Sequence, residues 1–285
     1  MQQFRFCSPR SLNEALNCLS DKKDRCKIIA GGTDLIPALR LEDIRPEVVL
    51  NILEIEELAA IREDEDSIRI GSTVTFTEIV ESDPLNRHLP LLVQAAASAG
   101  GPQVRNRGTI GGNIANASPA ADLLPAVIAL EGQLELCSKV SGKRRVPLVE
   151  AVLSPYKTSI RPDEMLTEIV IQKLQPGTKT AFEKLGRRNA MARARMNLSL
   201  MVAQEKDGRV AEIRIVPGAV MPVARRMKRA EEVLLGKKPG DKEIEAASDA
   251  LIEEMIAGAG RRWSTEYKVP VMCNIFGRIL RSLIK

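Results

Sequence analysis

Two stretches of the sequence place paired glycines beside hydroxyl, amide or carboxylate side chains. The first is residues 30–34 (AGGTD), and the second is residues 109–113 (TIGGN). Glycine tolerates positive φ and allows close approach to the main chain, so inward-turned backbone N–H groups can bind a diphosphate. A helix that begins behind such a loop adds partial positive charge. The pattern favours a phosphate-containing cofactor, and an ordinary Gly-Gly turn remains an equal alternative from the residues alone.

Neither stretch matches the glycine pattern of a Rossmann dinucleotide site or of a P-loop. Thr33, Thr109 and Asn113 could add side-chain hydrogen bonds to a bound diphosphate. A single Gly-Gly pair indicates an ordinary turn, and two such stretches, each with polar side chains beside its glycines, make the cofactor interpretation equal to it.

Other catalytic chemistry has little support. The single histidine, His88, lies in a polar, proline-flanked segment that resembles no nucleophile motif. The five cysteines form no C-x-x-C pair, and we expect them to be small buried hydrophobes in a reducing compartment: Cys7, Cys18, Cys26, Cys137 and Cys273. The sequence therefore predicts no metal site, no iron–sulfur cluster and no catalytic side chain, and it assigns any chemistry to a bound organic cofactor.

Composition excludes several other classes. Lys and Arg number 42 against 37 for Asp and Glu, and aromatic residues make up only 3%, so nucleic-acid binding is not favoured. No apolar run approaches the ~20 residues of a membrane span. The N-terminus has no apolar leader region. We expect a cytoplasmic protein that does not bind a membrane.

The elements around the first glycine pair follow the order of a small parallel βαβ unit. Ser11 and Glu14 form a capping box that opens an amphipathic helix. A strand at 26–30, the glycine turn, a helix from Leu35 to Arg40 and a strand at 48–52 follow.

Around the second pair, Thr75 and Glu78 form another capping box, and the glycine-rich segment 100–116 leads into a helix. The other elements predicted here are strands at 67–71, 134–137 and 168–171 and helices at 91–99 and 121–130.

A boundary is predicted at Gln175-Pro176-Gly177. Beyond it, Asp207-Gly208 indicates a hairpin turn. The elements predicted in this part are strands at 181–185, 198–203 and 210–216 and helices at 223–235, 241–257 and 265–284, the last with an apolar stripe that we assign to the core. The fold class is α+β, with domains at 1–176 (subdomains 1–55 and 56–176) and 177–285.

Both glycine motifs together, AGGTDL at 30–35 and TIGGNIANASPAADLLP at 109–125, resemble the FAD-binding medium subunit of the molybdenum hydroxylase (xanthine dehydrogenase and carbon monoxide dehydrogenase) family. The resemblance extends over nearly the whole chain and includes the segment 187–197, RRNAMARARMN. It implies a two-part FAD-binding domain, a small parallel α/β piece plus a mixed, mainly antiparallel sheet, with FAD extended between them. A smaller α+β C-terminal domain with a three-stranded sheet and helices would follow.

The resemblance also implies which residues bind FAD. Position by position, two segments would hold the pyrophosphate through backbone amides: Ile29, Ala30, Gly31, Gly32, Thr33, Asp34, Leu35 and Ile36, and Thr109, Ile110, Gly111, Gly112 and Asn113. The remaining implied contacts are Ala99 near the ring systems, Asp122 as a carboxylate touching FAD, Leu166 and Lys184 beside the isoalloxazine, and the basic Arg195.

From the residues alone, several of these have other interpretations. Asp122 could cap the helix that begins at Leu123. Alternation in RARM places Arg193 and Arg195 on one strand face, which could neutralise the diphosphate, meet a partner subunit or be solvated. Arg105 and Arg107, which flank the second glycine pair, could add positive potential or be exposed to solvent.

The function implied by the resemblance is electron relay. An iron–sulfur small subunit with [2Fe–2S] clusters would pass electrons from a molybdopterin large subunit to FAD, which would deliver them to NAD or another acceptor. Some relatives carry a further cluster in this subunit, but no cysteine-rich insert occurs here. Two alternatives remain: an assembly or nucleotide-sensing subunit without redox activity, and a stand-alone flavoprotein of the vanillyl-alcohol oxidase type.

Overall fold

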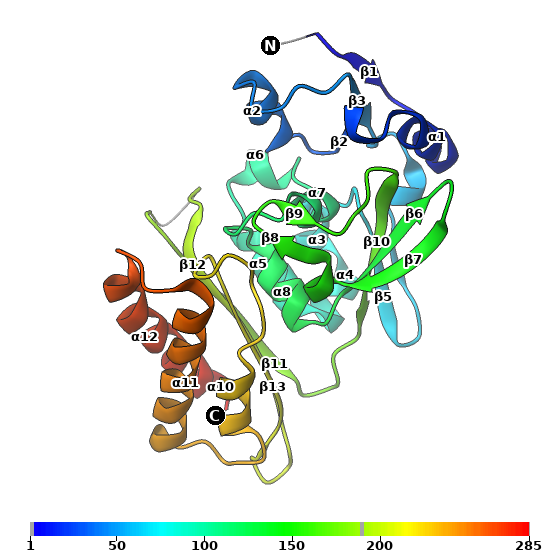
Figure 1. Cartoon of the computed structure of the whole chain (residues 1–285). Helices are drawn as coiled ribbons and strands as arrows, with labels where there is room; N and C mark the ends of the chain where they lie inside the picture. The colour runs from blue at the N-terminus through cyan, green and yellow to red at the C-terminus, as the bar shows by residue number, and fades with distance from the viewer. Residues whose placement is uncertain (1–2, 189–190, 285) are drawn as a thin grey trace. The chain divides into compact units, whose positions relative to one another are not determined.

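The computed structural model describes residues 3–188 and 191–284 and contains two compact units (Figure 1). The N-terminal unit comprises Met1–Pro84, Gly100–Ser118 and Glu131–Gln172, and the C-terminal unit comprises Leu85–Ala99, Pro119–Leu130 and Lys173–Lys285. The chain therefore passes repeatedly between the units before it completes the second one. The domain division at residue 176 stays a prediction.

A three-stranded parallel sheet begins the N-terminal unit. Its strands are β1 (Arg5–Cys7), β3 (Val48–Asn51) and β2 (Cys26–Ile29), in that order. Helix α1 (Leu12–Lys22) packs on it through Ala15, Leu16 and Leu19, and the Ser11 side chain caps the helix as predicted. A short turn at Lys23–Arg25 and helix α2 (Leu35–Arg40) complete this part. The predicted parallel unit is confirmed, and β1 is an additional strand.

The second sheet of this unit has five strands and is antiparallel at each of its pairings. In order, the strands are β4 (Ile61–Glu63), β5 (Ser67–Gly71), β10 (Glu164–Gln172), β6 (Gln133–Ser138) and β7 (Gly142–Pro147). Short elements complete the unit: the turn at Glu56–Leu58, α3 (Phe76–Glu81) with the predicted Thr75 capping box, α6 (Pro102–Arg105), α7 (Ile110–Asn116), α9 (Leu148–Ala151), β8 (Val152–Ser154) and β9 (Lys157–Thr158). Helix α4 (Asp83–His88) extends across the boundary at Pro84.

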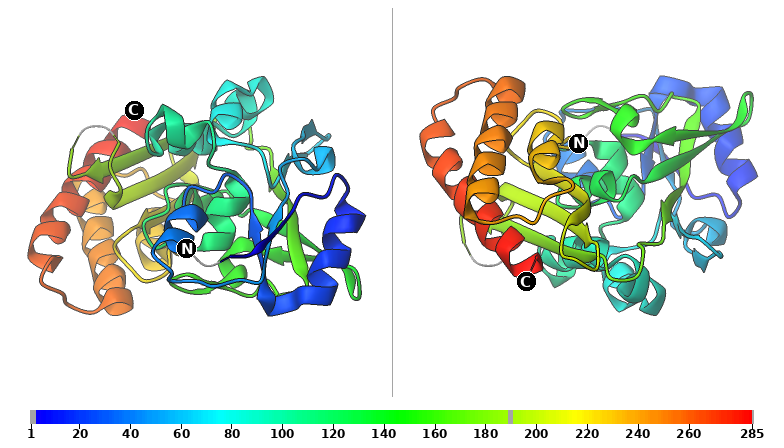
Figure 2. Two further views of the ribbon diagram at one scale, coloured as in Figure 1. Left: turned by 90° about the horizontal axis from the view of Figure 1, so that it is seen from above. Right: turned by 90° about the horizontal axis from the view of Figure 1, so that it is seen from below.

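The C-terminal unit is built on a three-stranded antiparallel meander. Its strands are β11 (Lys179–Gly186), β12 (Ala194–Gln204) and β13 (Val210–Gly218), and Gly208 adopts φ +87° in the predicted hairpin turn. Helices α10 (Lys228–Leu234), α11 (Asp241–Ala259) and α12 (Thr265–Leu283) cover one face, and α11 and α12 lie side by side (Figure 2). The predicted apolar stripe of α12 is buried in this core, but α10 begins five residues later than predicted.

The two faces of the meander differ in chemistry. Met196, Leu198 and Leu200 of β12 point into the apolar core beneath α10–α12. The alternating residues, which include the buried Asn197 and Ser199, face the other way. Helices α5 (Pro90–Ser98) and α8 (Leu123–Ala129) contact β11, β12 and β13 on that side. Polar side chains from distant segments therefore meet on one face of this sheet.

Candidate functional site

The first glycine stretch connects the end of β2 to the start of α2. Gly32 has φ +73°, a left-handed conformation that glycine adopts without strain. Within the described part of the chain, the backbone N–H groups of Gly31, Gly32, Thr33 and Asp34 donate to no protein acceptor. Successive unpaired N–H groups in such a turn form a concave anion site, so this stretch is suited to bind a diphosphate.

The two glycine stretches are neighbours in space. A Cβ added to Gly31 would lie 1.8 Å from the carbonyl oxygen of Arg107 and 3.1 Å from Cα of Gly108. The backbone of the first stretch therefore lies directly against the residues that lead into the second. The two motifs, which are far apart in the sequence, therefore lie close together, and this closeness depends on the missing side chain of Gly31.

The second stretch is the first turn of helix α7, whereas the sequence predicted a loop before a helix. Thr109 is the N-cap, and its hydroxyl accepts the N–H of Gly112 at 3.1 Å. The other amides also have partners inside the protein: Ile110 donates to Val74 O, Gly111 to Ser72 O and Asn113 to Thr109 O.

These bonds correct the role expected of Ile110, Gly111, Gly112 and Asn113. Their N–H groups hold the helix in place and are not available to a diphosphate. A Cβ at Gly111 would lie 2.5 Å from the carbonyl oxygen of Ser72, so this glycine serves close packing within the protein. What the stretch can offer a ligand is the Thr109 hydroxyl hydrogen and the side-chain amide of Asn113.

Three buried polar atoms beside this turn have no hydrogen-bond partner within the described residues: Asn113 Oδ1, Ser72 Oγ and Thr73 Oγ1. A buried polar atom left unpaired costs about 1–3 kcal/mol, so the chain leaves hydrogen-bonding capacity here that a polar ligand can use. Ser72 and Thr73 were not predicted as site residues. The sequence feature that could have marked them as site residues is their position directly after the strand that ends at Gly71.

The C-terminal unit contains a separate buried polar cluster. Lys184 Nζ donates to Asp122 Oδ2 at 2.5 Å and to the carbonyl oxygen of Ser98 at 3.1 Å. Asn197 Nδ2 donates to the other oxygen of Asp122 at 3.2 Å. The Lys184 and Asp122 side chains are only 11% and 9% exposed, so this ion pair is largely shielded from water.

Burial raises the pKa of the Asp122 carboxyl, while Lys184 and Asn197 act in the opposite direction. Asp122 stands at the N-cap position of α8, but its side chain makes no capping hydrogen bond. The capping interpretation of Asp122 is therefore wrong, because both carboxylate oxygens bind other side chains. Asn197 is the partner that sequence reasoning did not single out, since a buried asparagine within a strand gave no functional signal.

The remaining predicted residues are in different surroundings. Leu166 is buried in β10 beside a bulge, and Ala99 is buried directly after α5. The Arg195 guanidinium stacks on the Tyr267 ring, 4.9 Å from its centroid, while Arg193 is exposed. Arg105 donates to the carbonyl oxygen of Gly100. Asn189 and Ala190 of the family-like segment lie outside the described residues.

Across residues 3–188 and 191–284, no three His, Cys, Asp or Glu side chains form a group that could hold a metal ion. None of the helices described has the length and apolarity needed to cross a membrane.

The unpaired amide turn and its polar surroundings are suited to a diphosphate-containing cofactor. Comparison with known families specifies the cofactor: residues 2–173 match the FAD binding domain in molybdopterin dehydrogenase, and residues 180–283 match the CO dehydrogenase flavoprotein C-terminal domain. The chain belongs to the FAD-binding medium-subunit family of the molybdenum hydroxylases, and it is an oxidoreductase subunit whose cofactor is FAD.

Individual relatives match this chain over almost their whole length. The chain is 33% identical to the carbon monoxide dehydrogenase medium chain of Hydrogenophaga pseudoflava, covering 98% of this chain and 96% of the relative. It is 30% identical to the xanthine dehydrogenase FAD-binding subunit of Escherichia coli O157:H7, covering 96% and 94%. A solved structure of the Hydrogenophaga pseudoflava carbon monoxide dehydrogenase lacking the Mo-pyranopterin moiety superimposes with a TM-score of 0.91, covering 97% and 96% of the two chains. The two-part fold expected from the resemblance is confirmed.

Proposed function

We propose that this chain is the electron-transfer subunit of a multi-subunit molybdenum hydroxylase. It would take electrons from the [2Fe–2S] clusters of an iron–sulfur small subunit, which a molybdopterin large subunit has reduced, and pass them to an external acceptor such as NAD. When bound, FAD supplies the ability to collect single electrons and release them in pairs. The observation that carries the proposal is the free amide turn at Gly31–Asp34 in a chain of this family.

The role of the chain is to bind and orient the cofactor. Backbone N–H groups of Gly31, Gly32, Thr33 and Asp34 would donate to the pyrophosphate oxygens, and the positive φ of Gly32 gives this turn its concave shape. The Thr109 hydroxyl and the Asn113 amide would add side-chain hydrogen bonds. Fixed donors of this kind need no reorganisation when the anion binds, which favours tight retention of the cofactor.

The buried cluster of Lys184, Asp122 and Asn197 would fix the position of one ammonium group and one carboxylate away from bulk water. Fixed charges near a redox group shift its potential because a low-dielectric interior screens them weakly. On the family resemblance, Ala99, Asp122, Leu166, Lys184 and Arg195 are proposed as further FAD contacts.

The names of the relatives support the proposed partner subunits. One relative is a medium chain and another an FAD-binding subunit, so each is a part of a larger enzyme. We propose the same arrangement for this chain, with an iron–sulfur small subunit and a molybdopterin large subunit as companions in the cytoplasm.

The test is to purify the chain from its native cells together with its companions. We expect equimolar FAD, with a visible oxidised-flavin spectrum that dithionite bleaches, and co-purifying iron–sulfur and molybdenum polypeptides. Substrate added without an acceptor should bleach the flavin, and NAD or another acceptor should restore its colour. A protein that stays colourless after incubation with FAD would instead support an assembly subunit, and a flavoprotein that purifies alone and turns over its own substrate would support a stand-alone oxidase.

A further inference from the structure

Three cysteines that are dispersed in the sequence converge in the N-terminal unit. Cys7 is on β1, Cys26 on β2 and Cys18 on α1, the helix that covers this sheet. Cys7 and Cys18 both pack against the apolar cluster that contains the buried Cys26. All three are reduced. The proposed electron relay uses none of them.

The strand register decides which pairs can bond. Cys7 is aligned with Leu50 and Cys26 with Val48 of the central strand β3, so all four side chains lie on the face that α1 covers. Cys7 and Cys26 are on opposite sides of β3, and two strand spacings place their Cα atoms roughly 10 Å apart or more. A disulfide requires about 7 Å or less. Cys18 is therefore a member of any disulfide that forms among the three.

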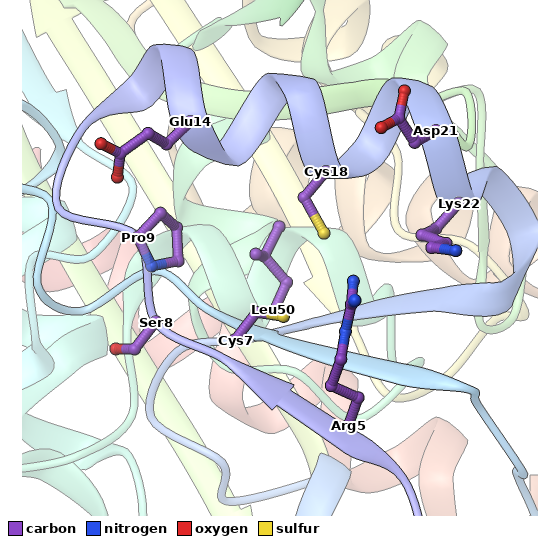
Figure 3. A pocket seen from close by; sticks show the side chains of 9 residues that line it. All are labelled: Arg5, Cys7, Ser8, Pro9, Glu14, Cys18, Asp21, Lys22 and Leu50. Carbon is purple, nitrogen blue, oxygen red and sulfur yellow. The ribbon is translucent and has the colours of Figure 1, made fainter.

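Solvent access indicates which of the two other cysteines forms a disulfide with Cys18. Cys7 and Cys18 line an open pocket of ≈ 380 Å³ together with Arg5, Ser8 and Leu50 (Figure 3). Figure 3 shows the two sulfur atoms directed into this space from β1 and α1. Cys26 is 6% exposed and does not line the pocket. A small oxidant in the pocket thus reaches Cys7 and Cys18 but not Cys26.

We propose that Cys7 and Cys18 form an oxidative modification site, where a hydroperoxide in the pocket converts the two thiols into an intramolecular disulfide. The Cys18 sulfur attacks the O–O bond of the hydroperoxide, so the thiol becomes a sulfenic acid and the peroxide is reduced to an alcohol, or to water when it is hydrogen peroxide. The Cys7 sulfur then displaces the sulfenic oxygen, which leaves as water while the S–S bond forms. Two thiols lose two electrons and two protons, and the hydroperoxide accepts both.

The surroundings of Cys18 set the rate of this reaction. Burial raises the pKa of the Cys18 thiol, the neighbouring Cys7 adds to this increase, and Cys26 and Arg5 partly offset it. Little thiolate is present at neutral pH, so the site reacts slowly with dilute peroxide and records sustained exposure rather than brief pulses.

Trypsin provides a direct test because each cysteine falls on its own peptide: residues 6–10, 11–22 and 26–27. The flavin-loaded full chain is treated with hydrogen peroxide, the remaining thiols are alkylated, and the unreduced digest is analysed by mass spectrometry. We expect peptides 6–10 and 11–22 to be joined with the loss of two hydrogens, two of the five thiols to be consumed, and dithiothreitol to reverse both changes.

Matched variants separate this reaction from general oxidation. Cys7→Ser and Cys18→Ser should each abolish the joined peptide, whereas Cys273→Ser, which alters a half-buried thiol on α12, should leave it unchanged. The disulfide map of the wild-type protein tests the proposal even if a variant folds poorly. Linkage of peptide 11–22 to 26–27, or separate sulfinic acids with no linked peptide, would overturn the proposal.

Discussion

Replacing Gly31 by alanine tests the central claim that two touching backbone segments shape the pyrophosphate site. The added Cβ would lie 1.8 Å from the carbonyl oxygen of Arg107, and such contacts do not occur below 3.0 Å, so the two segments must separate until that gap is open. Gly31 has no positive φ, so alanine strains the contact and not the local backbone.

The expected loss of FAD affinity follows from that displacement. An N–H···O bond of about 2.9 Å fails when stretched beyond about 3.5 Å, so a shift of about an ångström at Gly31 would break the bonds that Gly31 and Gly32 are proposed to make to the diphosphate. Each bond to a charged group contributes about 1.5–3 kcal/mol. Losing two of them weakens FAD binding by a factor of about a hundred or more.

The assay is FAD titration of the flavin-depleted full chain, followed by flavin fluorescence. Gly240→Ala is the matched control, because Gly240 has φ −98°, its Cβ would meet only the Glu243 carboxylate at 3.2 Å, and it belongs to neither glycine stretch. Circular dichroism verifies that both variants fold. A folded Gly31→Ala protein with wild-type FAD affinity would refute the assignment of this turn to the pyrophosphate.

Three further predictions concern charge and packing. Lys184→Met should lower the free energy of unfolding by about 3 kcal/mol, because it leaves Asp122 buried without its ion-pair partner. Adding Asp122→Asn to this variant should recover part of the loss, as measured by urea unfolding midpoints. Equal losses in the single and the double variant would contradict the pairing. Burial alone would raise the pKa of Glu164, but hydrogen bonds from Arg144 and Arg161 outweigh it and hold the pKa at about 2, below its usual 4.5. The resulting stabilisation of about 3 kcal/mol is present above pH 4.5 and lost as the pH falls towards 2, and Glu164→Gln should flatten this part of the stability–pH curve; an unchanged curve would count against it. Gly218→Ala should destabilise the C-terminal unit by about 1–3 kcal/mol, since its Cβ would lie 2.2 Å from Asn197 Oδ1, and an unchanged melting temperature would show that the contact relaxes freely.

Local signals explain what the sequence predicted well. The Ser11 and Thr75 caps and the Asp207-Gly208 turn each act within a few residues, and each is found where expected. The βαβ order around Gly31 likewise follows from neighbouring apolar runs and a turn. Such features depend on short-range sterics and hydrogen bonds, which the sequence contains directly.

Long-range pairing explains what the sequence did not predict. Strand β1 has only three residues, and its pairing with β3 creates the group of cysteines that seemed dispersed in the sequence. The second glycine stretch is helical despite its glycines, because the Thr109 cap and the bonds to Val74 and Ser72 outweigh their low helix propensity. Asn197 was identified as a site residue only from the structure, in which its side-chain amide on β12 donates a hydrogen bond to Asp122.

With the pyrophosphate site proposed at residues 31–34, the contact between Gly31 and Arg107 also constrains when FAD can bind. During synthesis the turn at 30–34 leaves the ribosome long before residues 100–118, and until those residues dock, its contact with Arg107 is absent. Closing so long a loop is entropically costly and slow compared with forming α1 or α2. Nascent chains should therefore be unable to hold FAD until the segment around Arg107 is in place, which makes cofactor loading a late step of maturation.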